Sequence, residues 1–347
     1  MTAPSPAQTS GGAVGTTYRY PFSPYPEGWY LLRESAALGP GEVVPLRYFG
    51  RDLVLYRTDG GRAVVADAHC PHMGAHLGHG GAVDGEGIRC PFHRWRFDAS
   101  GECSDVPYAR DGRAPRVCVR TWPVREHSGL VMVWCSEAGR DPWWEPPRRA
   151  EHGAPGWLGY VTAGWTIRMH TQELVENVPD TAHFTYVHTV GDGLRAEYEI
   201  DGHVYRQRSL MPVDGGYVEF TRQEASGLGL VWLRTNGAVP SWFLTATTPI
   251  DDEHVELRLL FLVPDETGTG EIGPAARAMV DATVENTSRD VPIWEHKVYV
   301  ERAPLVADDG PIREVRRWAR QFYPSPSSGS TDAADAPADG GEASSHA

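Results

Sequence analysis

The chain has 347 residues, of which 41% are apolar, and a formal net charge of −14 at pH 7. This length allows two domains with sizeable cores, and the negative charge argues against nucleic acid binding, which relies on clustered cations to neutralise phosphates. No apolar run approaches the roughly 18 to 20 residues of a membrane span, and the N-terminus lacks the basic-then-apolar order of a signal peptide. We therefore expect a cytoplasmic protein without a membrane span.

Both ends of the chain have a composition typical of disorder. Residues 1–18 and 324–347 are mostly Ser, Ala, Gly, Pro and Asp, with almost no apolar side chain to bury, so we expect both segments to be disordered. Between them, the stretch 141–156 holds four prolines and no periodicity, which is typical of a domain boundary. We expect a first domain over 19–145 and a second over 146–323.

Short strand patterns with turn signals fill the first domain. The segments RDLVLYRT (51–58) and RAVVADA (62–68) are separated by a turn that holds Asp-Gly-Gly, and GLVMVWCS (129–136) follows later. Runs of this kind, rich in branched residues and punctuated by glycine, are typical of β-hairpins. The sequence therefore predicts an all-β first domain.

Two turns of this domain each carry one cysteine and one histidine. Cys70-Pro71-His72 is followed, after seventeen residues, by Cys90-Pro91-Phe92-His93. Two cysteines and two histidines fit either a tetrahedral zinc ion or a [2Fe–2S] cluster with the cysteines on one iron and the histidines on the other. Zinc fingers typically keep like ligands together, whereas each turn here carries one of each kind. The spacing therefore favours the cluster, with Cys70, His72, Cys90 and His93 as its ligands.

The second domain mixes helix and strand patterns. We expect helices over 171–189, roughly 274–300 and 311–321, and strands over 203–213, 217–225 and 254–263. Strands with helices clustered around them predict an α+β domain with an antiparallel sheet. Pocket residues are expected on the strands near 217–263, where the aromatic side chains of Trp232, Trp242 and Phe243 fit a core better than a pocket wall.

A second group of possible metal ligands lies at the start of this domain. Residues 176–188 read ENVPDTAHFTYVH, and two histidines with one carboxylate form the facial triad of non-haem Fe(II) oxygenases, which leaves open positions for O₂. On a regular α-helix, His183 and His188 would point about 140° apart. We therefore predict a π-bulge, a kink or a helix end between them, so that both rings can reach one iron.

The order C-x-H, C-x-x-H and then N-x-x-D-x-x-H-x-x-x-x-H resembles the oxygenase component of Rieske non-haem iron oxygenases over roughly 27–322. The resemblance implies an all-β Rieske [2Fe-2S] domain followed by a catalytic domain of antiparallel sheet and helices, of the START-like helix-grip type. It implies that Asp290, in SRDVPIWEHK, is the third iron ligand beside His183 and His188, with Asp281 as the weaker candidate.

The same resemblance implies roles for two further side chains and for other proteins. Asp180 would bridge His183 of its own iron site and His93 of the partner subunit in a homotrimer, and Asn177 is an additional candidate catalytic residue. Electrons would come from a separate ferredoxin and its NAD(P)H-dependent reductase, as the resemblance to an oxygenase component implies. Arginines around the second cluster turn, from Arg89 to Arg116, are candidate contacts for an acidic ferredoxin.

RDVPIWEHK together with DGPIREVRRWARQFY (309–323) looks like the branch of ketosteroid 9-alpha-hydroxylase and cholesterol 7-desaturases. That branch implies O₂-dependent hydroxylation of a large, mostly apolar polycycle, steroid-like or natural-product-like. Dihydroxylation of an aromatic ring, desaturation and oxidative cyclisation start from the same iron site and stay open. A Rieske electron-transfer protein, the alternative from another class, would leave residues 150–322 without a task.

Overall fold

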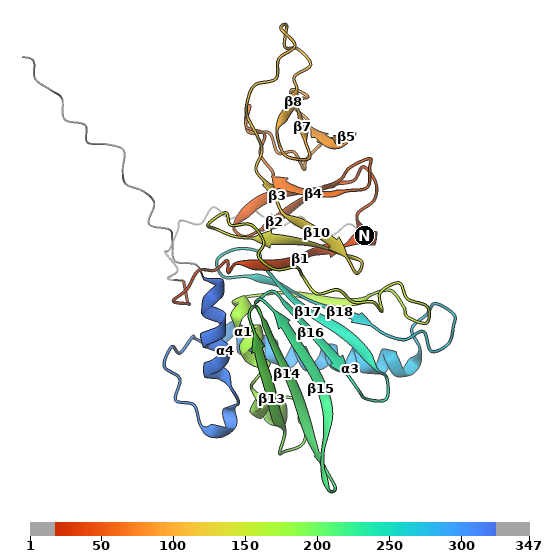
Figure 1. Cartoon of the computed structure of the whole chain (residues 1–347), viewed down its shortest axis with the longest axis vertical. Helices are drawn as coiled ribbons and strands as arrows, with labels where there is room; N and C mark the ends of the chain where they lie inside the picture. The colour runs from red at the N-terminus through yellow and green to blue at the C-terminus, as the bar shows by residue number, and fades with distance from the viewer. Residues whose placement is uncertain (1–17, 324–347) are drawn as a thin grey trace, which may run out of the picture.

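The computed structural model describes residues 18–323, so the predicted disordered ends lie almost wholly outside the described residues. Figure 1 shows the strands of the first half stacked above one large sheet that the second half forms. Antiparallel strands dominate and helices are few, as the predicted α+β class requires. None of the helices between residues 18 and 323 has the length and apolar content of a bilayer-spanning segment.

The first half forms three small antiparallel sheets, with strand orders β1-β11-β10, β2-β3-β4-β9 and β5-β6-β7-β8. The predicted all-β character is therefore confirmed. The strands are β1 (Gly28–Glu34), β2 (Val43–Tyr48), β3 (Arg51–Arg57), β4 (Ala63–Asp67), β5 (Ala82–Asp84), β6 (Gly87–Arg89), β7 (Arg96–Asp98), β8 (Cys103–Asp105), β9 (Thr121–Trp122), β10 (Val124–His127) and β11 (Leu130–Cys135).

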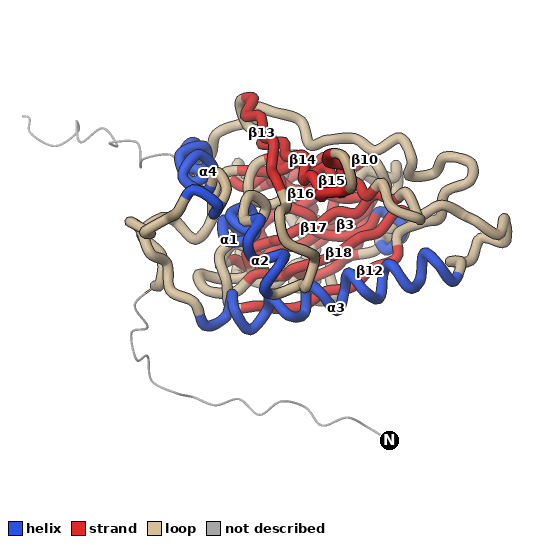
Figure 2. The backbone as a smooth tube through the Cα atoms, turned by 90° about the horizontal axis from the view of Figure 1, so that it is seen from below, coloured by secondary structure: helices blue, strands red, loops and turns tan. Residues whose placement is uncertain are grey.

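The second half forms a seven-stranded antiparallel sheet in the order β12-β18-β17-β16-β15-β14-β13. The strands are β12 (Val161–Ile167), β13 (Arg195–Asp201), β14 (Val204–Val213), β15 (Gly216–Ser226), β16 (Leu230–Thr235), β17 (Ser241–Pro249) and β18 (Val255–Leu262), and the helices are α1 (Thr171–Asn177), α2 (Thr181–Tyr186), α3 (Pro274–His296) and α4 (Ile312–Ala319). Figure 2 shows α1, α2 and α3 over one face of this sheet.

The helix predicted over 171–189 is two short helices, α1 and α2. Pro179 has no N–H to continue the hydrogen bonds of α1, and Asp180 leaves the helical region with φ −75° and ψ 92°. The Asp180 carboxylate then accepts a hydrogen bond from the His183 N–H, which makes it the N-cap of α2. The predicted long helix also ends earlier than expected, at His296.

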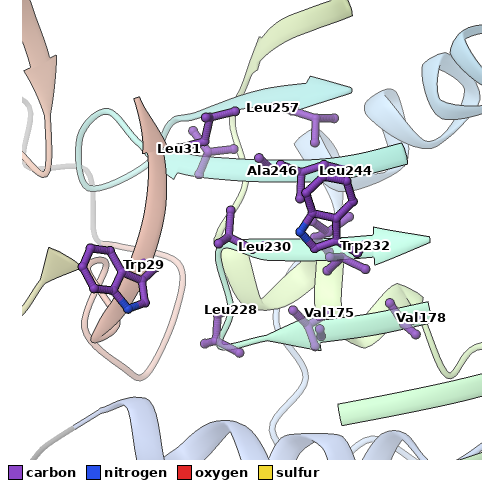
Figure 3. Packing of buried hydrophobic residues seen from close by; sticks show 14 of the residues in the cluster. Trp29, Leu31, Val175, Val178, Leu228, Leu230, Trp232, Leu244, Ala246 and Leu257 are labelled. Atoms are coloured by element: carbon purple, nitrogen blue, oxygen red, sulfur yellow. The ribbon is translucent and has the colours of Figure 1, made fainter. Parts of the chain in front are cut away.

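One apolar core joins the two halves. Trp29 and Leu31 of β1 belong to the same buried cluster as Leu230 and Trp232 of β16, and Figure 3 shows these side chains on neighbouring strands. The Thr248 hydroxyl of β17 donates a hydrogen bond of 2.7 Å to the Leu31 carbonyl. Each buried aromatic or aliphatic side chain in such a core stabilises the fold by about 3 kcal/mol. Since side chains of both halves share this core, the two halves pack as one body.

A buried histidine caps the helix that leads into the second ligand group. The His170 Nδ1 accepts a hydrogen bond of 3.0 Å from the Gln172 N–H at the start of α1, and its Nε2 lies 3.1 Å from the Ser23 carbonyl. These two bonds require the neutral ring with the proton on Nε2. Burial lowers the pKa of His170 from 6.5 to about 3, so the ring stays neutral in the folded chain.

This lowered pKa makes stability depend on pH. Below pH 6.5 the unfolded chain binds a proton at His170 and the folded chain does not, so stability falls as the pH drops towards about 3. By pH 5 we expect a loss of about 2 kcal/mol from this residue alone. His170→Asn keeps a capping side chain without a titrating ring, and should lose correspondingly less between pH 7 and pH 5 in denaturant melts. Equal losses in both proteins would contradict the assignment.

Candidate metal centres

The two cysteine–histidine turns have the same backbone conformation. In each, the cysteine carbonyl accepts a hydrogen bond from the residue four positions later, Gly74 (2.9 Å) or Arg94 (3.2 Å). These two residues also share the left-handed conformation, with φ +75° and +63°. Since Arg94 adopts this region against its Cβ preference, the turn geometry is strongly imposed by its surroundings. The same turn conformation thus occurs twice, and each turn presents a thiol and an imidazole.

The four side chains of these turns gather in pairs. Cys70 and Cys90 are 2% and 1% exposed, and the rings of His72 and His93 lie with centroids 4.8 Å apart. Within residues 18–323 no three of these four residues have ligand atoms gathered within 4.8 Å around one point. Separate thiol and imidazole pairs suit the two irons of a [2Fe–2S] cluster better than a single zinc ion.

The chemistry of the thiols also suits a cluster. Burial raises the pKa of Cys70 to about 11; backbone N–H groups of the turn oppose this rise, and the hydrogen bond to Cys90 adds to it. A buried thiol of this kind needs a bound cation to become a thiolate. The Nδ1 atom of His93 is buried and has no hydrogen-bond partner among the described residues, as expected of a ligand atom. These side chains therefore fit a [2Fe–2S] cluster.

The arginines proposed for ferredoxin docking divide into two sets. Arg89 is paired with Asp84 (2.6 Å) and Asp105 (2.8 Å), and Arg96 donates to the Asp84 carbonyl. Four others are exposed and form no salt bridge within the described part of the chain. They are Arg94, Arg110, Arg113 and Arg116. Only this second set has guanidinium groups that are not already used by the fold.

The second group of ligands meets where α2 ends. The last turn of α2 closes when the Val187 N–H donates to the His183 carbonyl at 2.7 Å, and Thr189 then turns left-handed with φ +56°. His188 therefore lies just beyond the helix, and the rings of His183 and His188 come to 5.1 Å between centroids. The interruption predicted between them is a helix end.

Asp290 completes this group from α3. Its Oδ2 lies 3.3 Å from the His188 Nε2, and one ligand atom from each of His183, His188 and Asp290 lies within 4.8 Å of the others. Asp290 is 7% exposed, whereas Asp281, the weaker candidate on the same helix, is exposed. The His188 Nδ1 is buried without a partner in the described residues. Two imidazoles and one carboxylate at one point fit a non-haem iron.

Asn177 and Asp180 both contact His183. The Asn177 Nδ2 lies 3.1 Å from the His183 Nε2, and the Asp180 Oδ2 lies 3.8 Å from the His183 Nδ1. Burial alone would raise the pKa of Asp180, but the hydrogen bonds and charge of His183 hold it below its usual value. With its side chain 32% exposed, Asp180 can contact both this histidine and a group outside the chain.

The segment after α3 and helix α4 hold α1 in place through two ion pairs. Arg316 of α4 donates to the buried Glu176 carboxylate at 2.7 and 2.9 Å, and Lys297, the only lysine of the chain, pairs with the buried Glu173. Buried charges of this kind are costly when one partner is lost. The segment after α3 and helix α4 therefore fix α1, which carries Asn177 beside the ligand group.

A cavity of about 200 Å³ opens beside His183, His188 and Asp290. Its walls are mostly apolar and come from α1, α2, α3 and the sheet. The apolar lining includes Leu174, Phe184, Phe220, Val231, Phe243 and Trp294. Among the aromatic residues considered from the sequence, Phe243 lines the cavity and Trp232 lies in the core, 1% exposed, while Trp242 packs against Arg149.

Sequence reasoning missed two lining residues, Thr221 and Gln223 of β15. Both are buried and alternate with the more exposed Arg222 and Glu224. Polar residues at the inward positions of an alternating strand are the signal that could have found them. The alternation gives the face of the sheet, but only the helices above it show that this face borders a cavity.

Comparisons with known proteins agree with this arrangement. The family model described as 3-Ketosteroid 9alpha-hydroxylase C-terminal domain matches residues 133–323, and that of the Rieske [2Fe-2S] domain matches 28–123. The chain is 32% identical to a probable 3-ketosteroid-9-alpha-monooxygenase oxygenase component of Rhodococcus rhodochrous, over 86% of this chain and 80% of that protein. It is also 32% identical to a cholesterol 7-desaturase of Bombyx mori, over 91% and 73%.

A solved structure shares the fold. The crystal structure of dicamba monooxygenase bound to 3,6 dichlorosalicylic acid aligns with a TM-score of 0.68 at 20% identity, covering 85% of this chain and 96% of that one. A further structure of dicamba monooxygenase contains non-heme iron. The order of a Rieske domain followed by a helix-covered antiparallel sheet is thus common to both chains.

Removing one carboxylate should separate the two metal centres. We expect Asp290→Asn to lower the iron content from three atoms per chain to two, because the ligand group at α2 loses its only anionic member while both cysteines remain. The visible spectrum of the cluster should be unchanged. Asp281→Asn, on the exposed face of the same helix, is the matched control and should keep three. Loss of iron in the control instead would contradict the assignment of Asp290.

Proposed function

The chain belongs to the Rieske oxygenase terminal components, in the family of the 3-ketosteroid 9-alpha-monooxygenases and cholesterol 7-desaturases, and from this premise we propose that it hydroxylates a large, mostly apolar polycycle. The observation that carries the proposal is the apolar cavity that opens directly on His183, His188 and Asp290. A steroid-like or natural-product-like skeleton has the apolar surface that such walls can bury. Hydroxylation consumes O₂, two electrons and two protons and releases water with the alcohol.

We propose that His183, His188 and Asp290 hold a mononuclear Fe(II), and that Cys70, His72, Cys90 and His93 hold the [2Fe–2S] cluster. When bound, the mononuclear iron supplies the redox chemistry that activates O₂. The chain's own part is to leave one side of the ligand group open to the cavity and to exclude water with apolar walls. Asn177 lies beside His183 and limits the directions from which this ring can face the metal.

The position of the two centres supports contact between subunits, and the oligomer that we propose is the homotrimer that the family resemblance implies. Figure 1 shows β5, β7 and β8, which flank the cluster turns, at the far end of the molecule from α1 and α3. Electrons therefore have a shorter route if the cluster of one subunit lies against the α2 region of the next. Exposed apolar side chains are present at both ends: Met73 and Phe92 at the turns, 64% and 59% exposed, and Tyr186 of α2, 84% exposed. These side chains leave apolar surface at both ends that a subunit contact could cover.

In this arrangement Asp180 is the proposed bridge between His183 and His93 of the partner subunit. Asp180→Asn keeps a side chain that caps α2 but removes the negative charge, so folding and both metals should be retained. We expect product formation to fall about 10- to 100-fold, in line with the loss of a hydrogen-bonded carboxylate that orients a metal ligand. Rapid mixing of reduced enzyme with O₂ and substrate should show a slower oxidation of the cluster. Turnover at the wild-type rate would exclude the bridge.

The electron donor that we propose is a separate ferredoxin, itself reduced by an NAD(P)H-dependent reductase. Its acidic surface would meet the four exposed arginines from Arg94 to Arg116 that the fold does not use. Arg113→Gln should raise the ferredoxin concentration needed for half-maximal turnover, and its effect should shrink as ionic strength rises. Arg47→Gln, an exposed arginine on β2, is the control. Equal effects of the two changes would contradict a specific docking surface.

The reaction is tested by the fate of a bound polycycle. Steroids should bind the reduced enzyme without O₂, and on mixing with O₂ the product should gain one oxygen atom by mass spectrometry. Loss of two hydrogens would instead show a desaturase or oxidative cyclase, and the similarity to the cholesterol 7-desaturase of Bombyx mori favours desaturation as the alternative. A gain of two oxygen atoms would show a dioxygenase. Reoxidation of the cluster without any change in the substrate would instead indicate an electron-transfer protein.

A further inference from the structure

Two polar side chains in the cavity wall are left without hydrogen bonds by the fold. The Thr221 Oγ1 and the Gln223 Oε1 are buried and have no partner among residues 18–323. The residues are only 6% and 5% exposed, and both line the cavity beside the iron ligands. A buried polar atom without a partner costs stability. Its presence in a binding cavity therefore points to a group on the ligand that completes it.

Three other hydroxyls that line the same cavity already form hydrogen bonds within the fold. The Thr235 hydroxyl donates to the Val239 carbonyl at 3.2 Å. The hydroxyls of Thr283 and Thr287 on α3 donate to carbonyls one turn earlier in the helix, at 2.9 and 3.0 Å. Their hydrogen bonds belong to the fold rather than to a ligand. Among the residues that line this cavity, Thr221, Gln223 and the candidate ligand His188 are those with a buried side-chain polar atom that has no partner within residues 18–323.

A neighbouring glutamine shows what a structural role looks like in the same place. Gln207 of β14 is paired directly with Gln223 across the two strands. Its Oε1 accepts a hydrogen bond of 2.6 Å from the Tyr205 hydroxyl, and its Nε2 donates to the Val178 carbonyl at 2.7 Å. Gln207 thus uses both ends of its amide to hold the strand to α1. Gln223, in matching surroundings, has an unpaired oxygen.

The backbone of β15 is shaped to place Thr221 at the cavity. In the pairing with β14, Thr221 lies opposite Ser209 and Glu219 lies opposite Leu210, so Phe220 is an extra residue without a partner. A bulge of this kind lets two consecutive residues face the same side. Phe220 and Thr221 accordingly both line the cavity. Gln223, two residues on, lies about 6.6 Å farther along the strand, so one atom between the two side chains can reach both.

We propose that Gln223 and Thr221 together bind a hydroxyl group of the substrate, at the part of the polycycle that lies on the sheet. A hydroxyl can donate to the Gln223 Oε1 and accept from the Thr221 hydroxyl at the same time. A ketone can only accept, and would leave the Gln223 oxygen unpaired. The iron ligands come from the helices that cover the sheet, so a fixed hydroxyl would decide which carbon faces them. This inference rests on the proposed function and adds a substrate class, a hydroxylated polycycle.

The first test needs no substrate. Gln223→Met and Thr221→Val replace unpaired polar atoms by apolar groups of similar shape, so the substrate-free holoenzyme should melt at the wild-type temperature or above it. Gln207→Met removes two hydrogen bonds of the fold and should melt at a clearly lower temperature. If Gln223→Met lowers the melting temperature as much as Gln207→Met does, Gln223 has a structural role and the proposal is wrong.

The second test measures selectivity. The reduced holoenzyme is titrated without O₂ with a steroid alcohol, the corresponding ketone and the deoxy analogue. We expect Gln223→Met to weaken binding of the alcohol at least about tenfold, with little change for the deoxy compound, and Thr221→Val to do the same to a smaller extent. Asn286→Leu, a change in the same cavity on α3, should affect alcohol and deoxy compound equally.

The outcomes separate this inference from the proposed function. If the wild-type enzyme binds the polycycles but Gln223→Met leaves the ratio of alcohol to deoxy affinity unchanged, only the polar anchor fails. If the ketone, rather than the alcohol, loses affinity in that variant, the hydroxyl assignment is overturned. If the wild-type enzyme binds none of the three compounds, the proposed substrate class, an apolar polycycle, is wrong. The proposed role of Gln223 and Thr221 is then wrong as well.

Discussion

The hydrogen bond that ends α2, from the Val187 N–H to the His183 carbonyl, is the interaction on which the catalytic half depends. If the helix continued, His183 and His188 would face different sides of it. Because it stops and Thr189 turns left-handed, both rings face the same buried carboxylate on α3. A β-branched residue in that conformation is rare, which indicates that the surrounding packing imposes the turn. The helix end gives up further helical hydrogen bonds, and in return both histidine side chains can point to the same place.

The cavity shows a division of roles between helices and sheet. Helices α2 and α3 provide the candidate metal ligands. The Asp180 carboxylate caps α2 at the His183 N–H, and the ion pair between Glu176 and Arg316 holds the neighbouring helix α1 to α4. The sheet provides a mostly apolar wall that also holds polar side chains, among them Thr221 and Gln223. Under the proposed function, reactivity and recognition lie on different structural layers, and we expect changes in the strands to alter substrate choice without displacing the ligand group.

Much of this could be predicted from the sequence, because the chemistry depends on side chains that are close in the chain. The C-x-H and C-x-x-H turns and the H-x₄-H stretch are local patterns, and each predicted its own geometry. Asp290 needed the resemblance to a family, since nothing in a helix more than a hundred residues later links it to His188. The sequence predicted an interruption between His183 and His188. It did not predict the earlier break in the helix expected over 171–189, where the effects of Pro179 and of the cap at Asp180 combine.

Other features could not be predicted because they depend on tertiary contacts. The alternation in β15 places Thr221 and Gln223 on one face of the strand, but only α1 and α3 above that face make it a cavity wall, and the bulge at Phe220 leaves no mark in the sequence. The occupation of Arg89 by Asp84 and Asp105 depends in the same way on strands that meet only in the folded chain. Local patterns therefore identified the candidate ligands, while long-range packing determines which side chains border the cavity beside them.

The shared core has a consequence for engineering. Trp29 and Leu31 belong in sequence to the cluster-bearing half, yet they pack with β16 of the other half. An exchange of the first domain with that of a relative would place foreign side chains into the centre of the catalytic half. Chimeras that move the electron-transfer module between members of this family should therefore carry their native β1 and β11 contact surface, or redesign both sides of it together.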